Sequence, residues 1–332
     1  MLETRPLGQT GLSVTPLGLG LAALGRPGYI NIGHADDLEH DYDVEAMEAH
    51  THTVLDSAWE AGIRYFDAAR SYGRAEAFLG SWLNARGIAP DQVTVGSKWG
   101  YTYTADWHVD AKVHEVKEHS LAVLRRQRGE SDALLGEQLD LYQIHSATLS
   151  SGVLDNAEVL DELARYQAGG LHIGLSLSGS GQVDTLKRAM EVTVDGKPLF
   201  ETVQITWNLL ELSSGPTLQE ASRRGMGVIV KEALANGRLT DRNDDPAFAD
   251  KRRLLDDLAL EYQTTVDALA LAAALAQPWA SVVLSGAAQT DHLHSNLGAL
   301  TLTWDEEMAT RLAALAEPPE QYWKIRSGLA WN

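Results

Sequence analysis

Short apolar segments alternate with longer segments of helical character along most of the chain. An apolar run bounded by polar or glycine-rich residues is typical of a buried strand, whereas apolar residues three and four apart are typical of an amphipathic helix. The pattern predicts eight strands, at 16–20, 63–67, 92–98, 139–145, 171–176, 202–207, 227–231 and 280–284. It predicts helices at 46–60, 74–85, 111–128, 155–167, 181–191, 217–224, 246–262, 266–276, 290–297 and 305–316.

Eight short strands separated by helices predict an α/β fold, a closed (β/α)₈ barrel of the TIM type. Two short strands flanking Gln9-Thr10-Gly11 predict an N-terminal β-hairpin within residues 1–14. We expect a single barrel domain over 1–332, a long loop at 25–45 and a tail without periodicity at 317–332.

An open doubly wound sheet is the alternative architecture. It requires a glycine-rich turn that runs directly into a helix after the first strand. Residues 18–23 match G-x-G-x-x-A, but Gly25, Pro27 and Gly28 follow at once and prevent a helix from starting there. The match is therefore interpreted as chance, and the closed barrel is preferred.

Charge and cysteine content narrow the function classes. The chain has 332 residues, with 46 acidic and 27 basic side chains and a formal net charge of -19, which disfavours nucleic acid and anionic membranes as partners. Cysteine is absent, which excludes disulfides and thiolate nucleophiles. The N-terminus lacks a signal-peptide pattern, and the longest apolar run is too short to span a bilayer. We expect a soluble cytoplasmic protein; the sequence carries no signal for an oligomeric state.

Four polar side chains follow three of the predicted strands: Asp67 and Tyr72 after one, Lys98 after the next and His145 after another. A closed barrel brings all strand ends to one rim, so we expect these side chains to meet. A tyrosine loses its proton near pH ~10, and a neighbouring ammonium should lower that pKa. Asp67 would orient Lys98, and His145 would donate to a substrate oxygen. The set suits proton transfer to a carbonyl oxygen, with the hydride supplied by a nicotinamide cofactor.

The segments 62–73 (GIRYFDAARSYG), 96–99 (GSKW) and 141–146 (LYQIHS) resemble signature blocks of the aldo-keto reductases, and the resemblance extends from Arg5 to about Asn296. It implies NAD(P)-dependent carbonyl reduction on a (β/α)₈ barrel without metal. By position, it implies that Tyr72 is the general acid, tuned by Asp67 and Lys98, and that His145 orients the carbonyl.

The same resemblance implies cofactor contacts. Ser176 and Gln204 match residues that hold the nicotinamide amide, although Leu177 replaces the expected Asn. Trp207 takes the place of an aromatic that stacks on the nicotinamide; packing in the core is its alternative role. Ser176 could instead cap a helix.

The phosphate-binding blocks depart further from the family. Glu232 stands beside the expected pyrophosphate, so Lys231 or Arg238 is expected to supply compensating charge; a structural ion pair is the alternative for Lys231. Ser285, Gly286 and Asn296 resemble the block that holds the adenosine phosphate. The Arg that commonly grips the 2′-phosphate aligns with His292. NADP(H) is the cofactor expected from family habit, with NAD(H) as the alternative.

Aromatic residues after the Lys98 strand are candidate walls of a substrate pocket. We expect Trp99 and Trp107 to line it, with Tyr101 and Tyr103 as further candidates and packing of a long loop as the alternative. Tail aromatics Tyr322, Trp323 and Trp331 either reach over the rim or dock on the barrel.

Histidines raise the question of a metal site. His114 and His119 miss both H-E-x-x-H and H-x-x-E-H, and residues five apart share no helix face. We expect no metal site, and surface positions for His50, His52, His108, His114 and His119.

The sequence therefore predicts an NAD(P)(H)-dependent oxidoreductase acting on an aldehyde, a ketone or a sugar-like alcohol. Two alternatives keep the cofactor but differ in outcome: a regulatory or redox-sensing module, and an isomerase or lyase that uses transient oxidation.

Overall fold

Eight parallel strands close into a barrel in the computed structural model, which describes residues 2–332. The strand order around the barrel is β12, β13, β14, β3, β4, β5, β8, β9, with β9 pairing back to β12. Their bounds are β3 (Leu17–Gly20), β4 (Tyr65–Asp67), β5 (Thr94–Trp99), β8 (Leu139–Ala147), β9 (His172–Leu177), β12 (Thr202–Thr206), β13 (Gly227–Lys231) and β14 (Val282–Ser285). The predicted (β/α)₈ barrel is confirmed.

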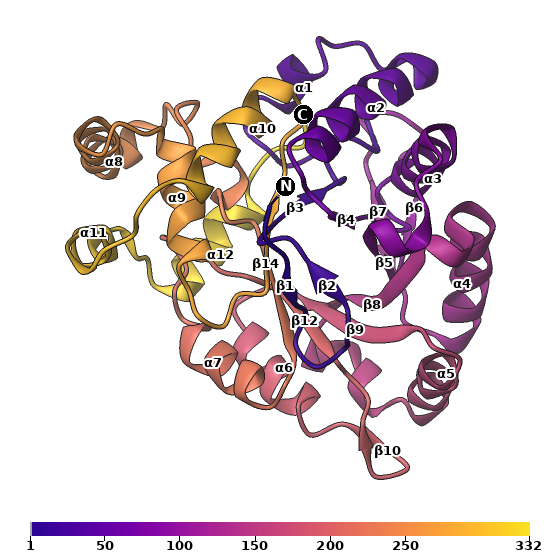
Figure 1. The fold of residues 1–332 in the computed structure, drawn as a ribbon. Coiled ribbons are helices and arrows are strands. Elements are labelled where there is room, and N and C mark those ends of the chain that lie inside the picture. Colours follow the sequence, from indigo (N-terminus) through magenta and orange to yellow (C-terminus); the bar gives the residue numbers. More distant parts are fainter. Residues whose placement is uncertain (1) are drawn as a thin grey trace.

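Helices surround the barrel and cover the outer face of its strands (Figure 1). The strands are largely buried on both faces because one face packs against helices and the other fills the barrel interior. The helices are α1 (His34–Asp37), α2 (Val44–Glu60), α3 (Ala75–Arg86), α4 (Leu121–Leu135), α5 (Ala157–Ala168), α6 (Gln182–Ala189), α7 (Gly215–Arg223), α8 (Ala249–Glu261), α9 (Val266–Leu275), α10 (Thr290–Leu297), α11 (Glu306–Leu312) and α12 (Pro319–Ser327).

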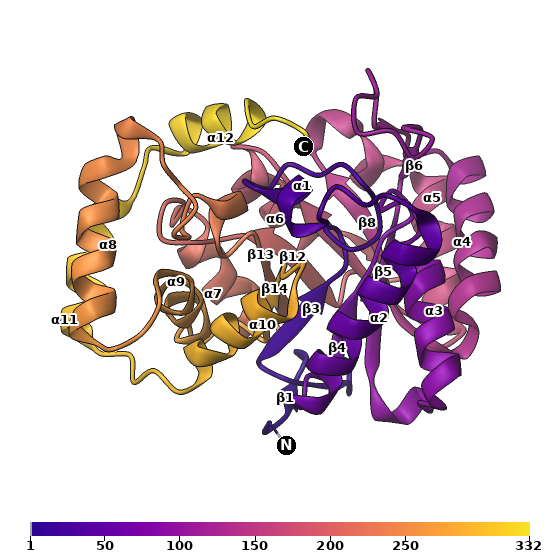
Figure 2. The same cartoon turned by 90° about the horizontal axis from the view of Figure 1, so that it is seen from above.

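The predicted N-terminal hairpin closes the amino end of the barrel. Strands β1 (Arg5–Pro6) and β2 (Ser13–Val14) pair antiparallel, and the loop between them inserts the fully buried Leu7 beside Gly227. Gly8 has φ +58, and a Cβ there would lie 2.3 Å from the backbone nitrogen of Gly227, so no larger residue fits this contact. Figure 2 shows the hairpin and the last residues of the chain at opposite ends of the barrel.

The helix predicted at 111–128 is wrong in its first half. Strand β6 (Tyr101–Tyr103) pairs antiparallel with β7 (Glu115–Lys117), so part of the predicted helix and the aromatic loop before it form a hairpin. Helix α4 begins only after Ser120, whose hydroxyl accepts the N–H of Val123 at 3.3 Å, and continues to Leu135. Strands of three residues are too short to carry a period of their own, which is why the pattern misled.

The tail at 317–332 is ordered by tertiary contacts. It contains α12, in which Tyr322 and Trp323 are buried, although no period was predicted there. Its last residue, Asn332, exchanges backbone hydrogen bonds of 3.0 and 3.1 Å with Tyr29. The predicted loop at 25–45 contains the short helix α1, and the hairpin of β10 (Thr193–Val194) and β11 (Lys197–Pro198) was not predicted.

Candidate active site

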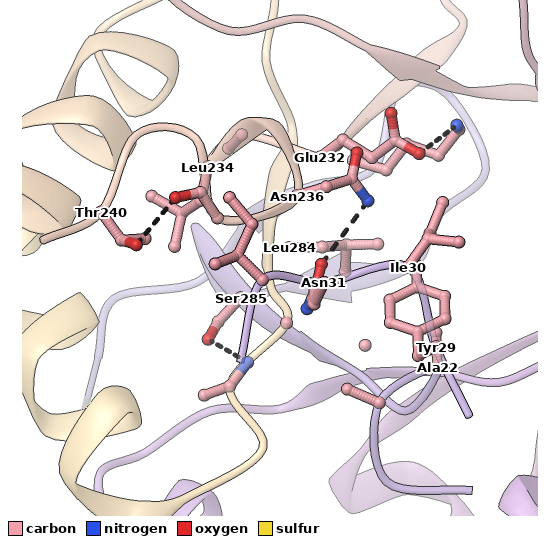
Figure 3. A pocket seen from close by; sticks show the side chains of 18 of the residues that line it. Ala22, Tyr29, Ile30, Asn31, Glu232, Leu234, Asn236, Thr240, Leu284 and Ser285 are labelled. Carbon is pink, nitrogen blue, oxygen red and sulfur yellow. Dashed lines mark hydrogen bonds and ion pairs between the residues drawn. The ribbon is translucent and has the colours of Figure 1, made fainter. Parts of the chain in front are cut away.

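A cavity of about 930 Å³ opens at the carboxyl ends of the barrel strands. It extends outward from the barrel mouth to α8, α9 and α10. Figure 3 shows part of its wall, where Asn31 and Asn236 point toward one another and Ser285 lies nearby. The predicted site residues that line it are Asp67, Tyr72, His145, Gln204, Lys231, Ser285, Gly286, His292 and Asn296.

An ion pair lies at the floor of the barrel mouth. Asp67 ends β4 and Lys98 lies on the neighbouring strand β5, so adjacent strands place the carboxylate and the ammonium at the same rim. The Lys98 ammonium pairs with Asp67 Oδ1 and also donates to the carbonyl oxygen of Ala68 at 2.9 Å. Both side chains are buried, so the pair places almost no net charge in the site.

Tyr72 lies in the turn between β4 and α3. The turn is tight because Gly73 has φ +58 and a Cβ there would lie 2.4 Å from the carbonyl oxygen of Gly25. The Lys98 ammonium is 4.9 Å from the centre of the Tyr72 ring, and the ring of His145 meets it edge-on with centres 5.4 Å apart. The four predicted residues therefore converge at one place.

The direction of the Tyr72 pKa differs from the expectation. Burial raises this pKa well above its ordinary value, and the negative charge of Asp67 raises it further. The ammonium of Lys98 was expected to lower it, but Asp67 neutralises that ammonium within the buried pair. Tyr72 is accordingly a protonated phenol at neutral pH.

His145 is a neutral imidazole. Burial lowers its pKa well below the ordinary value, and the positive charge of Lys98 adds to this effect. The Nδ1 atom lies 3.3 Å from the hydroxyl of Ser71, which leaves Nε2 for a ligand. His119 contacts the carbonyl oxygen of His145 at 3.0 Å and stacks edge-on against Trp99, so its predicted surface position is wrong.

Ser176 supports the rim and does not line the cavity. Its hydroxyl accepts the N–H of Ser146 at 2.8 Å, and Ser146 has φ 50, a conformation that costs a non-glycine residue about 1–3 kcal/mol. Gln204 does line the cavity, but its amide donates to Asp67 Oδ2 at 2.9 Å.

A second buried ion cluster lies at the end of β13. The Glu232 carboxylate is 2.6 Å from Arg326 on α12 and 3.6 Å from Lys231, and it accepts from the hydroxyl of Thr206 at 3.1 Å. Burial alone would raise the pKa of Glu232, but Lys231 and Arg326 outweigh it and lower this pKa to about 2. Burial lowers the pKa of Lys231 to about 8. The compensating charge thus comes from Lys231 and Arg326.

Trp207 and Arg238 lie away from the cavity. Trp207 is buried in the core and packs edge-on against Trp279 with ring centres 5.5 Å apart, which is its alternative role. Arg238 forms two hydrogen bonds with Glu317, of 3.0 and 2.6 Å. The prediction that it compensates Glu232 is wrong, because Glu317 in the tail already engages its guanidinium.

Trp99 and Trp107 also lie outside the cavity wall. Trp99 is fully buried in the hydrophobic core, and Trp107 packs on Phe78 while its indole N–H donates to the carbonyl oxygen of Tyr42 at 2.6 Å. The substrate-pocket prediction is therefore wrong for both residues. Trp331 does line the cavity and stacks on His114, with ring centres 4.0 Å apart.

The outer end of the cavity contains the remaining predicted residues. The Ser285 hydroxyl accepts from the side-chain amide of Asn296 at 2.8 Å. Gly286 is exposed, and a Cβ there would meet open space. His292 faces Arg242 and Asp37, neither of which was predicted.

Several wall residues were missed. The buried Arg26 donates to Ser71 O and to Glu115, both at 2.9 Å, and its guanidinium lies 5.3 Å from the centre of the Tyr72 ring. The Arg-Pro-Gly of 26–28 offered only a loop signal. Tyr101, a candidate pocket wall from the sequence, does line the cavity, whereas Tyr29, Glu115, Ser178 and Arg326 near the barrel mouth were not predicted.

Among residues 2–332, no group of three or more His, Asp or Glu side chains is arranged to hold a metal ion. Within the same range, no helix has the length and apolar character needed to cross a membrane.

Known proteins resemble the chain over nearly its whole length. The Aldo/keto reductase family model matches residues 16–317. Pyridoxal 4-dehydrogenase from Microbacterium luteolum is 24% identical, with 97% of this chain and 95% of that protein covered. The aldo-keto reductase str7 from Strobilurus tenacellus is 25% identical, with 96% and 93% covered. The holo form of aldo-keto reductase AKR11C1 from Bacillus halodurans shares the fold, with a TM-score of 0.74, 20% identity, and 97% of this chain and 100% of that chain covered.

Proposed function

The chain belongs to the aldo/keto reductase family of oxidoreductases, and we propose that it transfers a hydride between a nicotinamide cofactor, NAD(P)(H), and an aldehyde or ketone or the matching alcohol. The observation that carries the proposal is the meeting of Tyr72, the Lys98–Asp67 pair and His145 at the mouth of one large cavity. A protonated phenol beside a neutral imidazole is suited to donate hydrogen bonds to a carbonyl oxygen.

The outer cavity supports a dinucleotide. Asn296 is 1% exposed, and its side-chain oxygen has no hydrogen-bond partner within residues 2–332. The exposed Gly286 leaves space for a ligand to approach the backbone. A nicotinamide, when bound in reduced form, supplies the hydride for the carbonyl carbon.

Each side chain of the site has a separate task. Tyr72 gives its phenolic proton to the carbonyl oxygen, and the high pKa keeps that proton available at neutral pH. His145 orients the carbonyl through Nε2, because Ser71 engages Nδ1. Lys98 and Asp67 fix the electrostatic environment of the phenol without adding net charge.

The cavity wall near Tyr72 supports a small hydroxylated carbonyl compound or a sugar as substrate. Tyr29, Tyr101 and Trp331 supply aromatic faces, and the paired charges of Arg26–Glu115 and Arg326–Glu232 supply polar groups. The relative named pyridoxal 4-dehydrogenase makes pyridoxal a rational member of the test panel.

The test is nicotinamide absorbance of the purified protein with NADH and NADPH against a panel of aldoses, small hydroxyaldehydes and pyridoxal. We expect net oxidation of the cofactor with at least one of these substrates. In Tyr72→Phe, the turnover should fall by about 10²–10⁴-fold, because the proton donor is removed, while cofactor affinity is kept.

Tyr166→Phe is the matched control, since this tyrosine lies on α5 outside the cavity and its loss should leave turnover unchanged. Unchanged turnover in Tyr72→Phe would falsify the role of Tyr72. Turnover of substrate without net cofactor oxidation would instead indicate an isomerase or lyase.

A further inference from the structure

Charged side chains from three segments meet at the outer end of the cavity. Asp37 is the last residue of α1, Arg242 lies between β13 and α8, and His292 lies on α10. Arg242 Nη2 is 2.5 Å from Asp37 Oδ1 and 2.8 Å from His292 Nε2. The second carboxylate oxygen of Asp37 is 3.9 Å from His292 Nδ1. Asp37, Arg242 and His292 are called the outer cluster below.

The Asp37 carboxylate is held in the cavity wall. The backbone carbonyl oxygen of Asp37 accepts from Gln289 Nε2 at 2.8 Å. Arg242 Nη1 donates to the carbonyl oxygen of Gly33, which lies in the same segment, at 3.2 Å. Asp37 is only 6% exposed but lines the cavity. The carboxylate is therefore built into the site, and Arg242 is already paired with it.

The rest of this end is also acidic. Arg252, which lines the wall at this end together with Arg242, is 2.7 Å from Asp256, and its guanidinium also donates to the backbone carbonyl of Asp241 at 2.8 Å. Five carboxylates thus stand against two guanidinium groups here. The carboxylates are those of Asp37, Asp241, Asp256, Asp267 and Asp291.

Two features beside the outer cluster indicate a ligand. The buried side-chain oxygen of Asn296 has no hydrogen-bond partner in the described part of the chain, and Gly286 leaves its backbone open to the cavity. The Asn296 oxygen, an acceptor, suits a ligand group that donates a hydrogen bond better than an anion, and the open backbone at Gly286 lets a ligand approach closely. The reacting groups at Tyr72 and His145 lie at the barrel mouth, so the outer end is available to the other half of a dinucleotide.

We propose that the outer end of the cavity binds the adenosine ribose of NAD(H), and that Asp37 excludes the 2′-phosphate of NADP(H). The inference rests on the proposed nicotinamide-dependent function and deepens it. It replaces the NADP(H) preference that family habit suggested.

The physical reason is charge. A phosphate monoester brings about −1.5 to −2 charges and requires an arginine that can turn toward it. Arg242 is already paired with Asp37, so a 2′-phosphate would have to displace a wall carboxylate or lie against it. A ribose hydroxyl instead donates a hydrogen bond to a carboxylate, as acidic residues accept from the 2′-hydroxyl in other NAD sites.

Binding titrations of the whole protein, read by tryptophan quenching, test the proposal with NADH, NADPH, 5′-AMP and adenosine 2′,5′-bisphosphate. We expect NADH to bind at least about tenfold more tightly than NADPH, and 5′-AMP more tightly than the bisphosphate. In Asp37→Asn, NADPH affinity should rise about tenfold while NADH affinity changes less than about threefold.

Asp36→Asn is the matched control, because Asp36 is an exposed neighbour outside the cavity wall and loses the same charge. It should leave the preference between the two cofactors unchanged. Asp291→Asn, on the exposed face of α10, is a second variant that should raise NADPH affinity by a smaller factor if Asp37→Asn does not fold.

Tighter binding of NADPH than NADH by the wild type would overturn the inference and leave the proposed function standing. An unchanged NADPH affinity in folded Asp37→Asn would overturn the role of Asp37. Binding of neither dinucleotide would overturn the proposed function itself, and the inference with it.

Discussion

The two ion clusters of the cavity differ in how the chain builds them. The Lys98–Asp67 pair comes from neighbouring barrel strands and is fully buried. The outer cluster joins Asp37 to two side chains more than 200 residues later in the chain, and its Arg242 side chain is 31% exposed. The Lys98–Asp67 pair is part of the barrel itself, so loss of either charge should affect the stability of the fold. The outer cluster is carried by the short helix α1, one loop and helix α10, all outside the barrel strands, so its residues can vary with little effect on the barrel.

The largest difference between the two clusters is expected in stability, when Lys98→Met is compared with Asp37→Asn. Lys98→Met leaves the Asp67 carboxylate buried without its cation, which should lower the free energy of unfolding by about 3–5 kcal/mol. Asp37→Asn should cost about 1 kcal/mol or less, because Arg242 remains partly solvated. Chemical denaturation measures both changes.

Lys112→Met, at an exposed lysine, is the control for loss of charge alone. The double variant Asp67→Asn/Lys98→Met should recover part of the stability without recovering activity. Equal destabilisation by Lys98→Met and Asp37→Asn would contradict the distinction between the clusters.

A smaller effect is expected in the pH dependence of carbonyl reduction. Burial lowers the pKa of His145 and raises that of Tyr72, so both keep their donor protons, and kcat/KM should vary by less than about twofold between pH 6 and 7.5. Lys231 has a pKa of about 8 and loses its positive charge as the pH rises through that value, which should lower kcat/KM.

The Lys231→Met variant identifies the source of that decrease, since its profile should lack the step near pH 8. A step that persists in this variant would assign it to another group. A step below pH 7 would show that Tyr72 or His145 titrates, in conflict with their burial.

The smallest effect is expected for Trp207→Phe. Because Trp207 packs on Trp279 in the core, cofactor affinity should change by less than about twofold, whereas direct stacking on a nicotinamide is worth about 0.5–1.5 kcal/mol. The same fluorescence titrations measure it. A tenfold weaker cofactor affinity in a folded variant would show that Trp207 contacts the cofactor, in conflict with its packing in the core.

Residues at strand ends were predictable where the barrel alone decides their place. Asp67, Lys98 and His145 lie on or at the ends of apolar strands, and closure of the barrel brings such ends together whatever the loops do. Tyr72 follows Asp67 by a short turn and could be placed with it. Wrong predictions arose where a side chain has two directions open to it: Trp207 turns into the core, and Arg238 turns to Glu317, 79 positions later.

By itself, the sequence determined the eight-strand barrel, its N-terminal hairpin and the rim where Asp67, Tyr72, Lys98 and His145 lie. Hydrophobic periodicity and strand direction are local properties, and closure of the barrel converts them into positions. Only the tertiary structure decided the charge state of Tyr72, the partners of Glu232 and the position of Asp37 in the cavity wall. Those depend on burial and on contacts between distant segments, such as Arg326 with Glu232 and Arg242 with Asp37, which no local pattern encodes.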